Sequence, residues 1–363
     1  MFLKPVLALS FLALAAIAFA GWGKPDSGGS VAYKVLPALR QGNLTIFPVV
    51  ADHSHNTAGF LTLDEGLRSG DIVVTESGQV QPLMRRRFFP ANRDGAQVNR
   101  LVLINNSKRP LILLAGEIVT GGKQDRVIGK DRIVPAESDP IDLSVFCVEP
   151  GRWVATSQVF GGHSYSMVTP GVRAKAMGDK DQQKVWSEVA ASRGAMEQAV
   201  APGAPAVAAE IGRTSSYARV MDNKEVQKRV DAVATPMEHN YSSLIHQLKD
   251  RQAIGVVVAV NGQLVWADLF ASPELLEKYW PKLVRSYATE AIVNRGKGGR
   301  ADEQSAQAFL ERMDGTREMV ESEPGVYRHS EISGDGYKVF ALTSLLPKTD
   351  FEVHLAKMAE ASF

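Results

Sequence analysis

The sequence lacks three features, and each absence excludes a class of protein. It has one cysteine, Cys147, in 363 residues, which excludes an intramolecular disulfide framework and a cysteine-rich zinc site. Its formal net charge is only +1, so bulk charge gives no support for nucleic-acid binding. After residue 20 no apolar run is long enough to span a bilayer, which argues against a polytopic membrane protein. With 45% hydrophobic and 22% charged residues, the chain has a globular composition.

The first 20 residues have the pattern of a secretory signal. Lys4 precedes an apolar run over residues 6–19, and Ala18 and Ala20 form a small-x-small cleavage site. We therefore expect cleavage after Ala20 and an extracytoplasmic mature protein, either periplasmic or secreted. An uncleaved segment would instead anchor the chain to a membrane. Residues 21–42 are interpreted as a leader.

The patterns after the leader predict an α+β fold with a mostly antiparallel N-terminal half. The apolar runs at residues 100–105 and 111–114, separated by a polar stretch, predict a hairpin of two buried strands. Helices are predicted in the middle of the chain: one capped by Asp179, and two short ones at residues 223–234 and 242–249. The alanine-rich residues 194–216 are predicted to be the least ordered interior region.

The C-terminal part carries the clearest local signal. Asn261 and Gly262 separate two β-rich runs, a pattern that predicts a tight hairpin because both turn residues must accept positive φ. Helices after Ser272 and at residues 301–313, and strands at residues 325–332, 337–343 and 351–355, are expected to follow. We predict one large domain over residues 43–345, with a sub-boundary near 194–216, and a C-terminal strand and tail over 346–363.

Two strand ends combine glycine with charged side chains and therefore predict a site. Glycine pairs let backbone amides approach a ligand closely, and polar groups at strand ends are rigidly held. Glu117, Asp125 and Glu149 are the candidate catalytic acids and bases; the alternative is that they pair with cations to hold loops together. The candidate ligand-binding residues are Gly121, Gly122, Lys123, Gln124, Arg126, Arg152 and Trp153. The spacing matches neither a Walker A loop nor a GxGxxG fingerprint.

The same segments resemble a known family. Gly116-Glu117, residues 121–126, Val134-Pro135, residues 147–153 and Asp268-Leu269-Phe270 together resemble the ARG and Rhodanese-Phosphatase-superfamily-associated Protein domain. The resemblance extends over roughly residues 43–345. It implies a genomic association with ADP-ribosylglycohydrolases and phosphatase-like proteins, and it carries no reaction with it. The secretory signal is a departure that weakens any role in intracellular ADP-ribose metabolism.

Charge is unevenly distributed along the chain. Residues 85–132 contain eleven Lys and Arg but only four Asp and Glu, an excess of seven positive charges beside the Gly-rich loop. Such a block favours an anionic ligand. The alternative is that these cations pair with the acidic remainder across the fold.

Two functions from different classes fit these observations. The first is a binding module that holds an anionic small molecule or a protein partner on the two strand-end loops. The second is a hydrolase that cleaves a glycosidic, phosphate or ADP-ribosyl bond, with Glu117 or Asp125 as acid and base. A structural role is a third. We expect no cofactor, no metal and no nucleic acid; His53 and His55 are interpreted as a solvated loop, and Cys147 as a buried, inert thiol.

Overall fold

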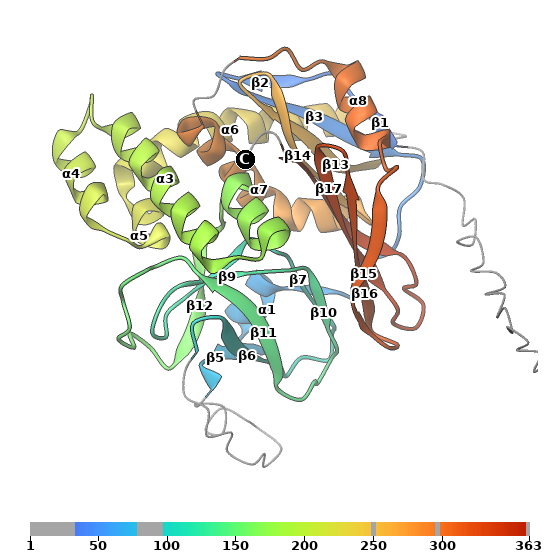
Figure 1. Ribbon diagram of the computed structural model, residues 1–363. Coiled ribbons are helices and arrows are strands. Elements are labelled where there is room, and N and C mark those ends of the chain that lie inside the picture. The colour runs from blue at the N-terminus through green and yellow to red at the C-terminus, as the bar shows by residue number, and fades with distance from the viewer. Residues whose placement is uncertain (1–32, 78–96, 248–251, 295–297, 361–363) are drawn as a thin grey trace, which may run out of the picture.

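The computed structural model describes residues 33–77, 97–247, 252–294 and 298–360, which form a barrel, a large sheet and a layer of helices (Figure 1). The predicted signal segment therefore lies outside the described residues, as do the arginines at positions 85–93. The large sheet has nine antiparallel strands. In spatial order they are β1 (Tyr33–Val35), β3 (Leu44–Ala51), β13 (Gln252–Val260), β14 (Gln263–Phe270), β18 (Glu352–Ala359), β17 (Tyr337–Ser344), β16 (Tyr327–Gly334) and β15 (Thr316–Glu323), with β2 (Leu39–Gln41) paired to β3.

The barrel lies at the bottom of Figure 1, below the helices, and is closed. Its strands follow the order β11 (Ile141–Cys147), β6 (Arg100–Asn105), β5 (Ile72–Thr75), β12 (Val159–Met167), β8 (Glu117–Thr120) and β9 (Arg126–Ile128). A smaller sheet of β10 (Arg132–Val134), β7 (Leu111–Leu113) and β4 (Leu61–Thr62) lies beside it. Alternate apolar side chains of the barrel strands, including Val74, Leu101, Leu143 and Phe160, fill a core of their own.

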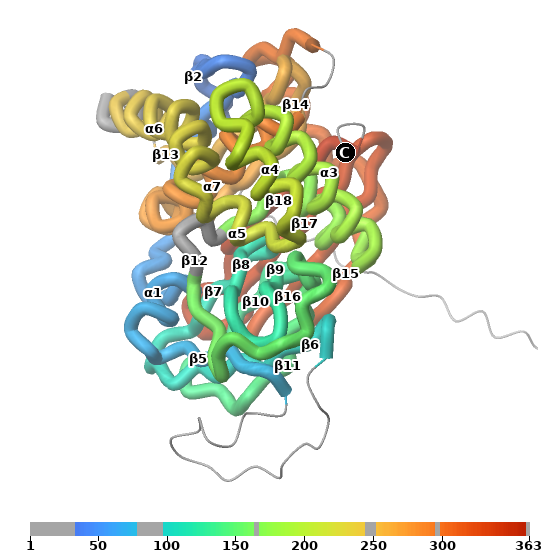
Figure 2. Tube along the Cα trace, turned by 90° about the vertical axis from the view of Figure 1, so that its left-hand side faces the viewer, coloured from blue at the N-terminus to red at the C-terminus, as the bar shows by residue number. Residues whose placement is uncertain are grey.

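Helices lie mainly between the barrel and the sheet and extend to one side (Figure 2), except the last one, which packs on the other face of the sheet. They are α1 (Leu63–Ser69), α2 (Pro170–Ala174), the π-helix η3 (Lys175–Asp179), α3 (Gln182–Val200), α4 (Pro205–Arg213), α5 (Tyr217–Asp222), α6 (Lys224–Gln247), α7 (Pro273–Val293) and α8 (Glu303–Glu311). The central helix α7 contacts β3, β13 and β14 of the sheet and also β12 of the barrel. None of the helices among the described residues is long and apolar enough to cross a membrane.

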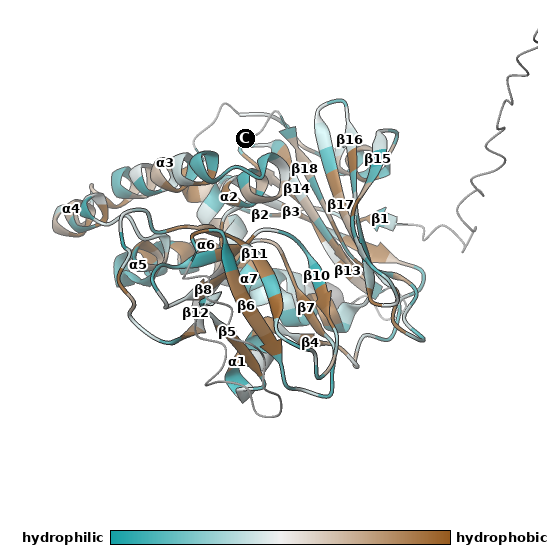
Figure 3. Ribbon diagram, turned by 60° about the horizontal axis from the view of Figure 1, so that its bottom comes forward, coloured by the Kyte–Doolittle hydropathy of each residue, from teal (hydrophilic) through white to brown (hydrophobic). Residues whose placement is uncertain are grey.

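The α+β prediction is confirmed, and the Asn261-Gly262 hairpin joins β13 to β14 with φ of 52° and 73° at the two turn residues. The exposed edge strand β15, which the sequence analysis missed, is largely hydrophilic (Figure 3). Most of its side chains are exposed, so its sequence lacks the alternation of apolar and polar residues that predicts a strand.

Four local predictions are wrong. Residues 100–105 and 111–114 form no hairpin, because β6 pairs with β5 and β11 while β7 pairs with β4 and β10. The two short helices are one, α6, which continues through Pro236. Asp181, not Asp179, caps the helix α3. Residues 194–216 are not poorly ordered but complete α3 and form α4, where Ala208 and Ile211 are buried. Part of the assigned leader also contributes β1 and β2.

Candidate functional site

The Gly-rich loop joins β8 to β9 and is built tightly against β12. Gly121 and Gly122 have φ of 127° and 48°, and a Cβ at Gly122 would lie 2.3 Å from the Phe160 ring. Only glycine therefore fits. The loop amides already have partners: Gly121 N donates to Asp125 Oδ1 (3.1 Å), and Lys123 N donates to Glu76 Oε1 (2.9 Å). These amides hold the loop in shape and are not free donors for an anion.

Several predicted site residues meet at the tip of this loop. We call Gln124, Asp125, Glu149, Arg152 and Ser216 the loop cluster. Arg152 Nη2 lies 2.5 Å from Glu149 Oε2 and 3.4 Å from Asp125 Oδ1. Gln124 Nε2 donates to Glu149 O (3.2 Å), and Ser216 Oγ donates to Asp125 Oδ2 (3.1 Å). The cluster thereby joins β9, the turn after β11 and the N-terminus of α5.

Electrostatics inside the loop cluster are only partly balanced. Burial, together with the neighbouring Glu149 charge, raises the pKa of Asp125. The Glu149 hydrogen bond raises the pKa of Arg152, so this guanidinium stays charged between the two acids. Arg152 is thus the one cation of the loop cluster and forms ion pairs with both Asp125 and Glu149. This is the chemistry of a structural contact between loops.

Glu117 is not part of this cluster. It begins β8, at the opposite end of the β8–β9 hairpin from Asp125, and its side chain is completely buried. One carboxylate oxygen accepts from Leu114 N (2.7 Å), and the other pairs with the ammonium group of Lys282 on α7. The structure therefore brings Asp125 and Glu149 together and separates Glu117 from both.

A hollow of about 560 Å³ opens beside the loop cluster, and we call it the Trp153 hollow. Its wall includes Glu149, Arg152, Trp153, Glu210, Arg213 and Arg219. Trp153 is 42% exposed, and the Lys123 ammonium lies 4.9 Å from its ring centroid. Arg213 and Arg219 are exposed and make no ion pair within the described ranges of the chain. Sequence reasoning missed both, because Arg213 lies within the segment that it assigned to poor order and Arg219 follows that segment by three residues.

Arg126 and Cys147 lie opposite each other on β9 and β11. Arg126 is fully buried, yet its hydrogen-bond partners among the described residues are two carbonyl oxygens, Asp125 O and Gln97 O, each at 3.5 Å. Burial lowers the pKa of Arg126. Burial also raises the pKa of the Cys147 thiol, which fits the inert role expected for it.

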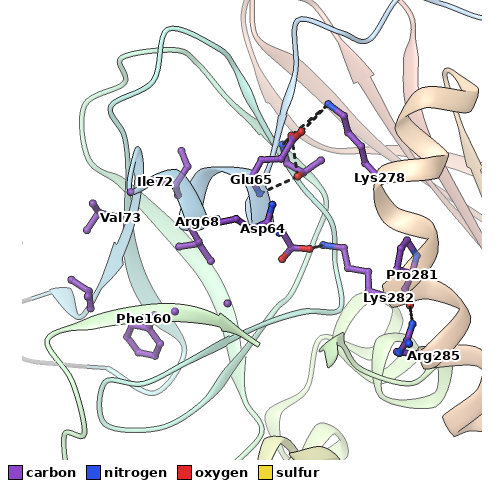
Figure 4. A pocket seen from close by; sticks show the side chains of 16 residues that line it. Asp64, Glu65, Arg68, Ile72, Val73, Phe160, Lys278, Pro281, Lys282 and Arg285 are labelled. Carbon is purple, nitrogen blue, oxygen red and sulfur yellow. Dashed lines mark hydrogen bonds and ion pairs between the residues drawn. The ribbon is translucent and has the colours of Figure 1, made fainter. Parts of the chain in front are cut away.

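A second hollow, of about 780 Å³, lies between α1 and α7 (Figure 4), and we call it the α1–α7 hollow. Thr62 and Glu65 form a capping box at the start of α1, and Ser272 caps α7. The charged side chains on its wall are Asp64, Glu65, Arg68, Lys278, Lys282 and Arg285. Sequence reasoning missed all of them, although Lys278, Lys282 and Arg285 have the spacing of one helix face.

A third set of charges is sealed inside the protein, and we call it the buried network: Asp131, Arg173, Asp268, Tyr287 and His354. Arg173 binds Asp268 through both terminal nitrogens, at 2.8 and 2.9 Å. His354 lies between two carboxylates, with Nδ1 2.6 Å from Asp131 Oδ2 and Nε2 3.1 Å from Asp268 Oδ1. Tyr287 donates to Asp268. The network ties the β9–β10 turn to α2, α7 and two central strands of the sheet.

No set of three or more His, Cys, Asp and Glu side chains in the described part of the molecule is arranged to hold a metal ion. His55, one of the two clustered histidines, stacks on Phe351 with ring centroids 4.2 Å apart.

The fold and these sites define an α+β protein in which a barrel and a sheet are joined by buried charges. A family model, the ARG and Rhodanese-Phosphatase-superfamily-associated Protein domain, matches residues 32–357. The chain belongs to this family, as the residues around the two strand-end loops predicted. No curated protein and no solved structure matches the chain.

Proposed function

We propose that the protein binds an anionic small molecule that carries a flat ring, and that the Trp153 hollow receives it. One observation carries the proposal: Arg213 and Arg219, which have no acidic partner in the described residues, share a wall with the exposed ring of Trp153. Guanidinium groups bind carboxylates and phosphates through paired hydrogen bonds, and an indole face stacks on planar rings.

The loop cluster supports this function indirectly. Arg152 is held by Glu149 and Asp125, so it is a fixed part of the wall and not a free anion ligand. Arg126 lies behind the cluster and adds a buried positive charge without an ion pair in the described chain. These two guanidinium groups face the carboxylates of Asp125 and Glu149, so the positive charge that would favour an anion over a neutral ring compound comes from Arg213 and Arg219.

The alternative, a hydrolase with Glu117 and Asp125 as acid and base, has less support from the geometry. The two carboxyl groups are bound to different cations, Lys282 and Arg152, at opposite ends of a hairpin. A paired mechanism needs both groups at one bond. Turnover of ADP-ribosyl or phosphoester substrates that falls in both Glu117→Gln and Asp125→Asn would favour this alternative.

Thermal unfolding in the presence of adenosine monophosphate, benzoate and inorganic phosphate tests the binding proposal. We expect the two ring-bearing anions to raise the unfolding midpoint and phosphate alone to do so less. The rise should disappear in Arg219→Ala and in Trp153→Ala, and it should persist in Lys184→Ala, a matched exposed cation on α3. If neither ring-bearing anion shifts the midpoint of the unmodified chain, the proposal fails.

The location of the protein is a separate part of the proposal. We propose that the chain is exported and that cleavage follows Ala20, because residues 1–20 have the n-region, apolar run and small-x-small site of a secretory signal. N-terminal sequencing of the protein from the extracytoplasmic fraction should begin at Gly21. A chain that retains Met1 and sediments with membranes would contradict cleavage.

A further inference from the structure

The α1–α7 hollow opens where two neighbouring barrel strands, β5 and β12, stop pairing with each other. The pairing of β12 with β5 ends at Phe160 and Val74, and the next two residues of β12, Gly161 and Gly162, pair with β8 on their other edge. The backbone of Gly161, Gly162 and Val73 therefore borders the hollow without a strand between. Backbone groups at such an unpaired edge are available hydrogen-bonding partners.

Glycine keeps this wall open. A Cβ at Gly162 would point toward α1, 3.5 Å from Leu67 Cδ1 and 3.9 Å from Asp64 Oδ1. A larger side chain at this position would occupy space between β12 and Asp64. Its backbone needs no positive φ, so a substitution would fill the hollow without straining the strand.

The two helices face each other with opposite charges across the hollow (Figure 4). Lys282 Nζ lies 2.8 Å from Asp64 Oδ2, and Lys278 Nζ lies 3.1 Å from Glu65 Oε1. Lys282 is only 5% exposed, because Glu117 binds it from behind. Burial lowers the pKa of Lys282, but Glu117 and Asp64 outweigh burial and raise it, so the ammonium group remains charged.

The wall carries more positive than negative charge. Arg68, Lys278, Lys282 and Arg285 face Asp64 and Glu65, and Glu117 behind Lys282 compensates one more cation, which leaves an excess of one positive charge. Arg285 is turned partly toward α6, where Asp231 lies 3.4 Å away. Arg68 is exposed and forms no ion pair with the described residues. Arg68 is therefore the cation best placed to bind a ligand anion without first breaking an ion pair.

This combination specifies a ligand with two kinds of group. A phosphate group would bind Arg68 and the two lysines through charge-assisted hydrogen bonds. A bare phosphate would also meet the negative charges of Asp64 and Glu65, which accept hydrogen bonds but donate none. Hydroxyl groups would satisfy these carboxylates. The volume lies within the range of about 300–1,000 Å³ that is usual for small-molecule sites.

We propose that the α1–α7 hollow binds a hydroxyl-rich organic phosphate, such as a monosaccharide phosphate. The phosphate binds Arg68, Lys278 and Lys282, the hydroxyl groups donate to Asp64 and Glu65, and the glycine edge of β12 contacts the sugar. This site is separate from the Trp153 hollow, so either can fail without the other.

Calorimetric titration of the full chain with glucose 6-phosphate, glycerol 3-phosphate, inorganic phosphate and glucose tests the site. We expect at least one of the two organic phosphates to bind ten-fold or more tightly than either phosphate or glucose. Arg68→Gln and Lys278→Gln should each weaken that binding at least five-fold. Lys184→Gln, which changes an exposed cation on α3, should leave it unchanged.

Two further variants distinguish this site from general attraction between charges. Gly162→Val keeps every charge and should abolish binding of the organic phosphate, with an unchanged unfolding midpoint showing that the barrel is intact. Asp64→Asn removes a negative charge and a strong acceptor, so it should strengthen binding of inorganic phosphate and weaken that of the organic phosphate. The proposal is overturned if neither organic phosphate binds more tightly than inorganic phosphate, or if Gly162→Val binds them as the unmodified chain does.

Discussion

Two arginines among the residues that the structure describes are fully buried, and they differ in what surrounds them. Arg173 on α2 forms two hydrogen bonds with Asp268 and lies 4.5 Å from the Trp266 ring. Arg126 on β9 has two carbonyl contacts at 3.5 Å, and its Nε has no partner among the described residues. Burial lowers the pKa of both guanidinium groups, but at Arg173 the Asp268 charge outweighs it and raises the pKa.

Arg173 is a buried charge with an ion pair that links parts of the fold, whereas Arg126 is a buried charge without an ion pair in the described residues. A buried ion is costly unless a counter-charge and hydrogen bonds replace its lost water. Arg173 has both, and its network joins the barrel side of the molecule to the sheet. Arg126 has neither to the same degree, and it lies behind the loops that we propose to border a ligand site. We expect a buried charge without an ion pair to be the better candidate for function, because pairing does not account for its presence.

The largest expected effect comes from breaking the Arg173–Asp268 pair. Arg173→Met leaves Asp268 buried without its main counter-charge, and removing one partner of a buried pair costs about 3–5 kcal/mol. Urea unfolding of the variant should show a loss of this size or a failure to fold. Lys338→Met, which removes a partly exposed cation 3.7 Å from Glu360, should cost less than about 1 kcal/mol. Equal losses in the two variants would contradict a structural role for the network.

The second effect is a dependence of stability on pH. Burial alone lowers the pKa of His354, but Asp131 and Asp268 outweigh it and raise the pKa to about 9. The folded state therefore holds this proton more tightly than the unfolded chain. Its contribution is complete below the ordinary histidine pKa and is lost as the pH rises through 9. Between pH 7 and 8 the free energy of unfolding should fall by roughly 1 kcal/mol.

The pH window matters because two other groups titrate near it. Burial raises the pKa of Glu352 to about 7, so the stability linked to its proton is complete at low pH and is mostly lost before the pH has risen to 7. Burial, aided by Arg312, lowers the pKa of Lys357 to about 8, and its deprotonation above pH 8 has the opposite sign. The decline between pH 7 and 8 should be absent in His354→Asn. An unchanged slope in that variant would assign the dependence to another group.

Local signals predicted local structure in this chain and failed where pairing is distant. The Asn261-Gly262 turn encodes its own hairpin, because the two residues set the backbone twist. No local signal shows that β12 divides its pairing between β5 and β8. Nor does one show that β18, near the C-terminus, enters the sheet between β14 and β17. These strand pairings are determined by long-range packing, when the barrel closes and the sheet is completed.

The candidate site was predictable to a similar extent. Residues 121–126 and 149–153 stood out by composition, and their side chains Asp125, Glu149 and Arg152 do meet. Glu117 resembled them in sequence, but β8 places it at the other end of the hairpin, against Lys282. Lys282 comes from α7, 165 residues away. Only tertiary packing could assign that partner, so the α1–α7 hollow had no signature in the sequence.

The smallest expected effect is the sharpest test of the comparison. Arg126→Met removes a buried cation that lacks an ion pair in the described chain, and its long carbonyl contacts contribute little. Because the methionine avoids the cost of burying a charge, the free energy of unfolding should change by less than about 1 kcal/mol or rise. Urea unfolding beside Arg173→Met measures both under one condition. A loss as large as that of Arg173→Met would show that Arg126 also holds the fold, and would remove the argument that its charge is kept for a ligand.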